Sequence, residues 1–426
     1  MRMLVLTLLA SSSLLAQEST QLTRQEAERI ALANNPRVHV SQLLAKVQGQ
    51  LVRETRAGEL PSLTGNLTGV GANEGSRIGS GTLTASLLLT HAGTGVQLNQ
   101  LITDFGRTRN MVASEKLKEK ARQADVVAGR QEITLAADQA FYEALDAQST
   151  LQIADQTVAT RQTLVDKVNA LTNAKLKSTL DLSFAKVDLA RAKLLQLDAR
   201  NRIESALAVL TSVLGFDHPV NYRLIEDTTE LPTLQPDAAP LIATALRQRP
   251  DLESLQFNEQ SARKFSTAQH DQLRPSINAI AIVGATPVGA SQYFSSDWYG
   301  AAGVNISIPI FDGFRFRAQA AEAKLQVNVA TEQIHQRRDQ VVQDVQTAWL
   351  NANTALQRVS VAAEFLKEAG MATDLAQSRY SLGLSSIVEL SQAELQQTEA
   401  AIGDANARTD YRLAIAALTF QTGGAY

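Results

Sequence analysis

Hydrophobic and polar residues follow two different periods along the chain. Apolar residues alternate with small or polar ones from Pro61 to Leu101, and again in "PSINAIAIVGATP" and "YGAAGVNISIPI", with glycine-rich connections between the runs. A period of two over such lengths predicts strands joined by turns. The chain therefore offers four candidate strands in two separate pairs.

Long segments without proline follow each strand pair. Residues 105–170 and 314–379 each predict one helix, which at about 1.5 Å per residue is on the order of 100 Å long and too long for a compact globule. Further helices are predicted at 22–57 with a break at Pro36, at 179–214, at 240–272 with an interruption near Pro250, and at 386–421. Two columns of alanines at seven-residue spacing predict close lateral packing of helices: Ala185, Ala192, Ala199 and Ala206, then Ala393, Ala400, Ala407 and Ala414.

The same order of elements occurs twice. "DFGRTRN" begins at Asp104 and "DGFRFRA" begins 208 residues later at Asp312, and at the same offset "STLDL" matches "SIVEL". A period of about 200 residues indicates a duplicated domain-sized unit rather than a solenoid. We therefore predict a first repeat at 17–216, a connector at 217–240 and a second repeat at 241–426.

The first 16 residues, "MRMLVLTLLASSSLLA", predict a secretory signal peptide. Arg2 precedes an apolar run, which is followed by small residues and then by polar "QEST". An N-terminal membrane anchor is the alternative, although the apolar run is short for a spanning helix. No other segment reaches about 18 consecutive apolar residues. The sequence therefore predicts export and cleavage.

Composition and motif content argue against several classes of function. The net charge of −3 offers no electrostatic basis for nucleic-acid binding, and the absence of cysteine removes disulfides and thiolate metal sites. The five histidines are scattered without metal-ligand spacing. There is no nucleophile elbow, no P-loop and no dinucleotide-binding glycine motif. We expect no catalysis, no cofactor and no metal site.

The four predicted strands pose a problem of closure. Four strands cannot form a barrel, and an open sheet edge in a bilayer is prohibitively costly. The strands therefore belong either to a soluble sheet or to a barrel that several chains share, and three chains would supply twelve strands. An aromatic cluster beside the fourth strand favours a membrane, because Tyr and Trp at strand ends form interfacial belts. Its members are Tyr293, Phe294, Trp298 and Tyr299; a loop packed on its own sheet is the alternative.

The junction "PIFDGFR" and the turn "RYSLGLSSIVELSQAE" of the second repeat, together with the duplicated order of elements, resemble the TolC-like outer-membrane efflux proteins. The resemblance covers essentially the whole mature chain. It implies an α+β membrane protein in which a homotrimer builds one twelve-stranded β-barrel, four strands per chain, continuous with a long periplasmic α-helical barrel. The implied function is the outer-membrane duct of a tripartite efflux or type I secretion system, which passively conducts substrates. The implied partners are a periplasmic adaptor (membrane fusion) protein, an inner-membrane pump and outer-membrane lipid.

The resemblance also assigns roles to particular residues. The implied periplasmic gate comprises Asp181, Tyr380, Glu389 and Gln392, and the implied tip that contacts the adaptor comprises Lys175, Lys177, Gly383 and Leu384. The strand–helix junctions contain Asp104, Arg107, Asp312 and Arg315. A second interpretation remains for two of the acids: "STLD" and "SIVE" both have capping-box form, so Asp181 and Glu389 would serve as helix caps.

A different class of protein also fits part of the pattern. A periplasmic coiled-coil adaptor or scaffold without a membrane barrel carries long helical hairpins as well. Two repeats, each entered through a strand pair, favour the duct.

Overall fold

The computed structural model describes residues 20–73, 77–80, 83–87, 91–220, 222–225, 230–288 and 297–424. The predicted signal peptide, together with Tyr293 and Phe294, lies outside these residues. The chain divides into two compact units: unit 1 is Met1–Val40, Val127–Arg249 and Gln340–Tyr426, and unit 2 is Ser41–Val126 and Pro250–Asp339. Each unit takes segments from both repeats, so the compact units do not coincide with the repeats.

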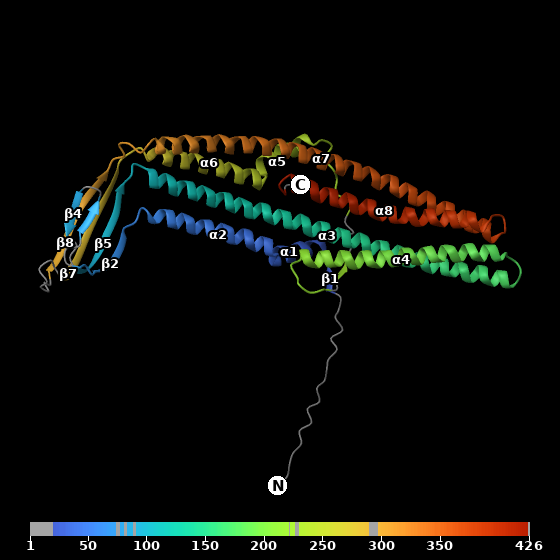
Figure 1. Ribbon diagram of the computed structural model, residues 1–426. Helices are drawn as coiled ribbons and strands as arrows, with labels where there is room; N and C mark the ends of the chain where they lie inside the picture. Colours follow the sequence, from blue (N-terminus) through green and yellow to red (C-terminus); the bar gives the residue numbers. More distant parts are fainter. Residues whose placement is uncertain are drawn as a thin grey trace, which may run out of the picture. The chain divides into compact units, whose positions relative to one another are not determined.

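The helices expected from the sequence are present. They are α1 (Arg24–Asn34), α2 (Pro36–Ala57), α3 (Arg107–Asn173), α4 (Thr179–Val213), α5 (Ala239–Gln248), α6 (Pro250–Asp271), α7 (Arg315–Ser381) and α8 (Ile387–Gln421) (Figure 1). Pro36 and Pro250 are each the first residue of a helix, where the missing N–H has no cost. Among the described residues, no helix contains an apolar stretch of the length needed to cross a membrane.

Eight strands are described: β1 (Thr20–Leu22), β2 (Ser62–Val70), β3 (Arg77–Ser80), β4 (Leu83–Leu87), β5 (His91–Thr103), β6 (Tyr222–Leu224), β7 (Ser276–Val288) and β8 (Asp297–Ser307). Four of them form an antiparallel sheet in unit 2 with the order β2-β5-β7-β8. The prediction of two strand pairs is thus confirmed, and both repeats contribute to one sheet. The short pair β1-β6 was not predicted, because runs of three residues carry too little periodicity. β3 and β4 lie inside the segment 61–101, where strands were predicted, but their pairing as a separate sheet was not.

The register of the four-stranded sheet separates its side chains into two chemically different faces. Directly paired residues of antiparallel strands lie on the same face. One face carries apolar side chains on every strand: Leu63, Leu67, Val96, Leu98, Ala281, Val283, Val304 and Ile306. The other face carries most of the polar side chains: Ser62, Thr64, Asn66, Gln97, Asn99, Asn278 and Asn305. Two apolar residues, Ile280 and Ile282, also lie on this face. The apolar face is uncovered in a single chain, and Leu67 is 88% exposed.

Polar contacts join the helices of unit 2. Ser114 of α3 and Ser261 of α6 are both buried and bind each other, with each hydroxyl 3.0 Å from the other residue's carbonyl oxygen. Arg337 of α7 forms an ion pair with Asp251 of α6 at 2.5 Å. A buried serine pair satisfies its own hydrogen-bonding groups, so it allows the two helices to approach closely.

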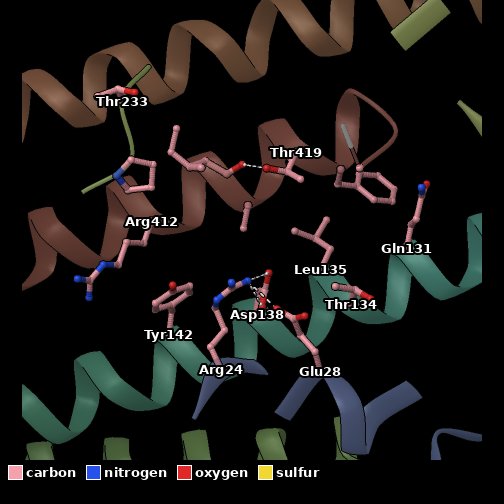
Figure 2. Close-up of a pocket in the computed structure, with 15 residues that line it drawn as sticks. Arg24, Glu28, Gln131, Thr134, Leu135, Asp138, Tyr142, Thr233, Arg412 and Thr419 are labelled. Atoms are coloured by element: carbon pink, nitrogen blue, oxygen red, sulfur yellow. Dashed lines mark hydrogen bonds and ion pairs between the residues drawn. The ribbon is translucent and has the colours of Figure 1, made fainter. Parts of the chain in front are cut away.

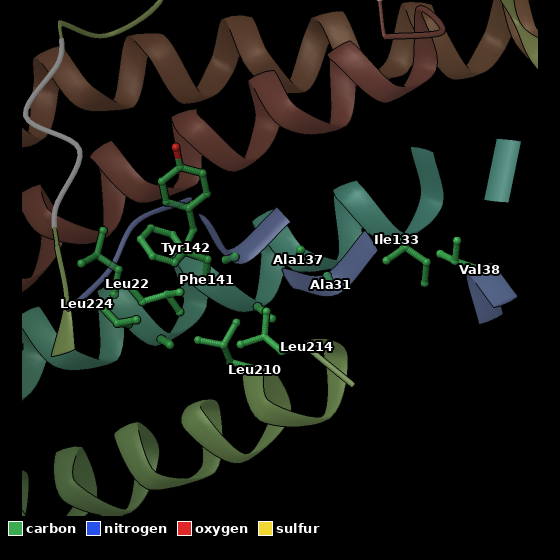
Figure 3. Close-up of a cluster of buried hydrophobic side chains, with 14 residues drawn as sticks. Leu22, Ala31, Val38, Ile133, Ala137, Phe141, Tyr142, Leu210, Leu214 and Leu224 are labelled. Atoms are coloured by element: carbon green, nitrogen blue, oxygen red, sulfur yellow. The ribbon is translucent and has the colours of Figure 1, made fainter. Parts of the chain in front are cut away.

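The largest buried cluster of unit 1 joins the N-terminal segment to α3 and α4. Phe141 of α3 lies at its centre, with Leu22 of β1, Leu224 of β6, and Leu210 and Leu214 of α4 around it (Figure 3). All five side chains are essentially excluded from solvent, apart from slight exposure of Leu224. The parallel pairing of β1 with β6 brings Leu22 and Leu224 into register, which explains why these two short strands form at all.

A second buried cluster of unit 1 lies near the turns that connect α3 to α4 and α7 to α8. It combines Val168, Leu189, Tyr380, Ile387 and Leu390, one or more from each of the four helices. The alanine columns were predicted to pack closely, and most of their members are buried: Ala185, Ala192, Ala199, Ala393, Ala400 and Ala407. Ala206 and Ala414 are partly buried.

Candidate functional site

The two helix turns of unit 1 lie together and form what is called here the turn end, residues 171–181 and 379–392. Lys175 and Gly383 occupy equivalent positions of the two repeats, and both have a positive φ, +61° and +75° respectively. In each turn the residue that follows the one with positive φ donates its N–H to the carbonyl oxygen five residues earlier. Leu176 donates to Leu171 at 2.9 Å, and Leu384 donates to Arg379 at 2.8 Å. These bonds satisfy carbonyl groups that the end of a helix leaves free.

The first turn ends in a capping box. Ser178 accepts a hydrogen bond from the N–H of Leu180 at 3.1 Å, and the N–H of Ser178 donates to the carboxylate of Asp181 at 3.4 Å. Asp181 is half-buried, whereas Lys175 is exposed. The cap uses one carboxylate oxygen of Asp181, so a capping role leaves the other oxygen available for a second contact.

The second turn differs from the first. Ser386 accepts a hydrogen bond from the N–H of Glu389 at 3.3 Å. The carboxylate of Glu389 forms an ion pair with Arg379 of α7 at 3.0 Å instead of reaching back to the cap. Gln392 and Leu384 are exposed. Sequence reasoning missed Arg379; its position one residue before Tyr380 was the only signal available.

Tyr380 of the second repeat packs against the first repeat. Its ring lies under the ammonium group of Lys177, with 4.2 Å from Nζ to the ring centre. Burial raises the pKa of Tyr380, and the negative charge of Asp181 raises it further. Within the described residues the buried hydroxyl of Tyr380 has no hydrogen-bond partner. The contact between the repeats is therefore a cation–π interaction.

A buried charged cluster lies farther along the same helices. Arg161 of α3 forms an ion pair with Glu394 of α8, and their side chains are only 7% and 9% exposed. Asp188 of α4 accepts a hydrogen bond from Ser391 of α8. Burial lowers the pKa of Arg161, and the charge of Asp188 opposes this effect. Sequence reasoning missed this cluster because its residues lie on three helices at unrelated positions.

The two strand–helix junctions belong to unit 2 and have the same hydrogen bond. Asp104 accepts from the N–H of Thr108 at 2.7 Å, and Asp312 accepts from the N–H of Phe316 at 2.7 Å. Each carboxylate thus binds an N–H group in the first turn of α3 or α7, where it also meets the positive end of the helix dipole. Arg107 and Arg315 are exposed and begin the two helices.

The two described members of the aromatic cluster lie on opposite faces of the sheet. Trp298 is 76% exposed and pairs with Ala285, which places it on the apolar face. Tyr299 pairs with Gly284 on the other face, where its hydroxyl lies directly over Gly284 and Gly95. A ring that covers glycines of neighbouring strands supports the sheet itself. The assignment of Trp298 and Tyr299 to an interfacial aromatic belt stays a prediction.

A cavity of about 700 Å³ lies in unit 1 between α1, α3 and α8. Figure 2 shows Arg24, Glu28 and Asp138 directed toward one another inside it. Arg24 lies 2.6 Å from Glu28 and 3.4 Å from Asp138. Burial raises the pKa of Asp138 to about 7, and its hydrogen bond with Glu28 acts in the same direction, while Arg24 opposes both. When Asp138 keeps its proton, the charges of Arg24 and Glu28 balance and the cluster carries no net charge.

Among the described residues, no three His, Cys, Asp or Glu side chains gather in an arrangement that would hold a metal ion. The polar groups at the turn end are caps, ion pairs and a cation–π contact. They can hold helices together or line a passage.

Comparison with known proteins assigns the chain to a family. The outer membrane efflux protein family matches residues 27–216 and 241–424. The chain belongs to the outer membrane efflux protein family. Its two matched segments correspond to the two copies of the repeated order of elements.

Individual relatives agree with this assignment. The chain is 23% identical over 440 residues to the outer membrane protein TolC of Escherichia coli, covering 95% of this chain and 82% of that protein. The solved structure of CusC, at 19% identity, has a TM-score of 0.81 and covers 94% of this chain and 92% of that one. The outer membrane channel CmeC of Campylobacter jejuni, at 16% identity, also has a TM-score of 0.81, with 95% and 86% covered.

The family determines the class of function. The protein is an outer-membrane efflux channel with a periplasmic extension, and it is not an enzyme. The alternative of a coiled-coil adaptor without a barrel is not favoured.

Proposed function

We propose that three copies of this chain close their sheets into one twelve-stranded barrel and conduct substrates passively. The observation that carries the proposal is the four-stranded sheet. Within the described residues, β2 and β8 each have one unpaired edge. In a bilayer such edges are tolerated only when they pair with other strands.

The faces of the sheet fit this arrangement. Barrel strands in a membrane alternate between apolar side chains toward lipid and polar side chains toward the lumen. The uncovered face with Leu63, Leu67, Val304 and Ile306 would contact lipid. The face with Thr64, Asn66, Gln97 and Asn305 would line the lumen.

The turn end is the proposed contact with the partners. Relatives of this family act in tripartite systems with a periplasmic adaptor and an inner-membrane pump. Exposed apolar side chains at both turns, Leu176, Leu180, Leu382 and Leu384, fit a docking surface for such an adaptor. Asp181, Tyr380, Glu389 and Gln392 would then control the entrance of the passage.

Disulfide crosslinking tests the closure of the barrel. The natural chain has no cysteine, so Thr64→Cys with Asn305→Cys places one thiol on each free edge, near the end of the sheet that adjoins the helices. Oxidation should link copies into a covalent product of about three times the chain mass. Gln97→Cys with Ile282→Cys is the control, because these residues pair within one chain.

The control variant should give a single-chain band. If the edge variant also remains a single chain under oxidation, while native mass measurement shows no trimer, the shared barrel is wrong.

A further inference from the structure

The second strand–helix junction exposes a large apolar surface. β8 ends at Ser307, but the alternation of apolar residues continues through Ile308 to Ile310, and Phe311 follows directly. Ile310 is 94% exposed and Phe311 is 76% exposed. The apolar face of the sheet therefore continues beyond the last strand, up to the start of α7.

Phe314 at this junction occupies a strained position. Its φ is +67°, a conformation that side chains rarely adopt, and the equivalent residue of the first repeat is Gly106. The ring of Phe314 is 62% exposed and meets Phe311 edge-on at 5.5 Å. Strain of this kind persists where a function requires the side chain. Because most of the ring is exposed, burial within this chain does not explain the phenylalanine.

Two arginines follow directly on α7. Arg315 and Arg317 are exposed, and within the described residues neither forms an ion pair with a carboxylate. Each lies near a phenylalanine ring instead: Arg315 is 4.9 Å from the ring centre of Phe316, and Arg317 is 6.0 Å from that of Phe314. The nearby Asp312 already accepts a hydrogen bond from the start of the helix. The junction thus combines two uncompensated cations with exposed aromatic rings.

A small cavity lies within the apolar surface of the second strand–helix junction. It has a volume of about 290 Å³, and Leu273, Ile310, Phe311, Phe314 and Arg317 are among the residues that line it. The lining combines these apolar side chains with Arg317 and with Asp312, whose carboxylate accepts a hydrogen bond from the N–H of Phe316, and Arg315 begins the adjoining helix. An amphiphile with a negative headgroup has the complementary order of groups.

We propose that this surface binds an anionic glycerophospholipid of the leaflet that borders the helices. The acyl chains lie along Ile310, Phe311 and Phe314, and the phosphate binds Arg315 and Arg317. The inference rests on the proposed barrel, because the apolar sheet face must point toward lipid. The positive charge of the two arginines favours a lipid with a negative headgroup, because a neutral or purely apolar ligand would leave both guanidinium groups without a counter-charge.

Native mass spectrometry of the full-length protein in detergent tests the proposal. Dioleoyl phosphatidylglycerol should bind more tightly than dioleoyl phosphatidylcholine, and excess inorganic phosphate should not displace it. Arg315→Gln with Arg317→Gln should weaken phosphatidylglycerol binding by about fivefold for each arginine removed. The matched control is Arg338→Gln with Arg358→Gln, which removes two exposed arginines elsewhere on α7. The control should bind like the natural protein.

Phe314→Gly separates lipid binding from a structural role. Glycine adopts a positive φ without strain, so this variant should keep its assembly and thermal stability while it loses phosphatidylglycerol binding. Equal binding of the two lipids, or unchanged binding in the arginine or glycine variants, would overturn the proposal. Loss of the trimer in these variants would also overturn it, because the surface would then be a contact between copies. Failure of the proposed barrel is distinguishable, since the unsubstituted protein would itself show no trimer.

Discussion

Arg161 in the first repeat and Glu394 in the second form an ion pair from which solvent is almost entirely excluded. The pair joins α3 to α8 next to Asp188 and Ser391, so a charged contact holds the two repeats together inside unit 1. Burial makes such a pair sensitive to the loss of either partner, because the remaining charge has neither water nor a counter-charge.

Glu394→Gln should therefore destabilise the protein by about 3 to 5 kcal/mol. Thermal unfolding of the purified channel measures the effect. Replacing both partners, with Arg161→Met and Glu394→Leu, should recover most of the loss, because no charge is then left buried. The exposed pair of Arg29 with Glu26 offers the control, and Glu26→Gln should leave stability almost unchanged because water screens this pair. A Glu394 variant as stable as that control would show that the pair contributes nothing.

The carboxyl group of Asp138 predicts a dependence of stability on pH. Its pKa is about 7 in the folded chain, whereas an aspartate in an unfolded chain titrates near pH 4. Between these values the folded state keeps a proton that the unfolded state releases, so stability should fall as pH rises from about 4 to about 7.

Asp138→Asn removes this titration and keeps a side chain of similar shape. The variant should be more stable than the natural protein above about pH 7, by about 1 to 3 kcal/mol, with a flatter profile below it. Urea unfolding at several pH values measures both quantities, and Asp198→Asn on the exposed surface of α4 is the control. Parallel pH profiles for the two variants would contradict the assignment.

The alanine columns predict an intolerance of larger side chains. Ala192 of α4 and Ala400 of α8 are 5% and 1% exposed, so leucine at either position should cost about 1 to 3 kcal/mol through overpacking. Thermal unfolding should show this loss, and Ala208→Leu on the exposed side of α4 should not. Normal stability in an Ala192→Leu, Ala400→Leu double variant would show that these helix contacts have room for larger side chains and are not closely packed.

The acids of the turn end predict ion selectivity. In a trimer Asp181 and Glu389 would supply six carboxylates, and acids in a constriction favour cations. Asp181→Asn with Glu389→Gln should lower the cation selectivity of single channels in planar bilayers. The loss of Glu389 also leaves Arg379 without its counter-charge, which adds to the effect. Reversal potentials in a salt gradient are the measurement, and trimer assembly is the control. Unchanged potentials would mean that the carboxylates act only as caps and ion-pair partners.

The unpaired hydroxyl of Tyr380 predicts that phenylalanine is tolerated in its place. Tyr380→Phe removes a buried hydroxyl that has no hydrogen-bond partner among the described residues, and it keeps the ring under Lys177. Stability should stay equal or rise by about 1 kcal/mol, whereas Tyr380→Leu should lose the cation–π contact and fall by about 1 kcal/mol. Thermal unfolding and bilayer conductance measure the two variants. A phenylalanine variant that opens the channel would reveal a hydrogen bond made by the hydroxyl in the assembly.

The sequence by itself determined the elements and their duplication. Long proline-free segments, the alternation in "SINAIAIV" and the repeated junctions at Asp104 and Asp312 are local signals, and local signals specify helices, strands and caps. They predicted one helix break at Pro36 and another near Pro250, and each of these prolines is the first residue of a helix. Exclusion of catalysis also rested on local motifs.

Only the tertiary structure decided which side chains meet. Arg161 and Glu394 are 233 positions apart in the sequence, and the sequence around each residue does not indicate that the two are paired. Trp298 and Tyr299 are neighbours in β8 and therefore lie on opposite faces, but which of the two joins the apolar face depends on how β8 pairs with β7. The contact of Tyr380 with Lys177 depends on the packing of two helix turns. Such contacts depend on the whole chain, because burial and pairing arise only when distant segments pack together.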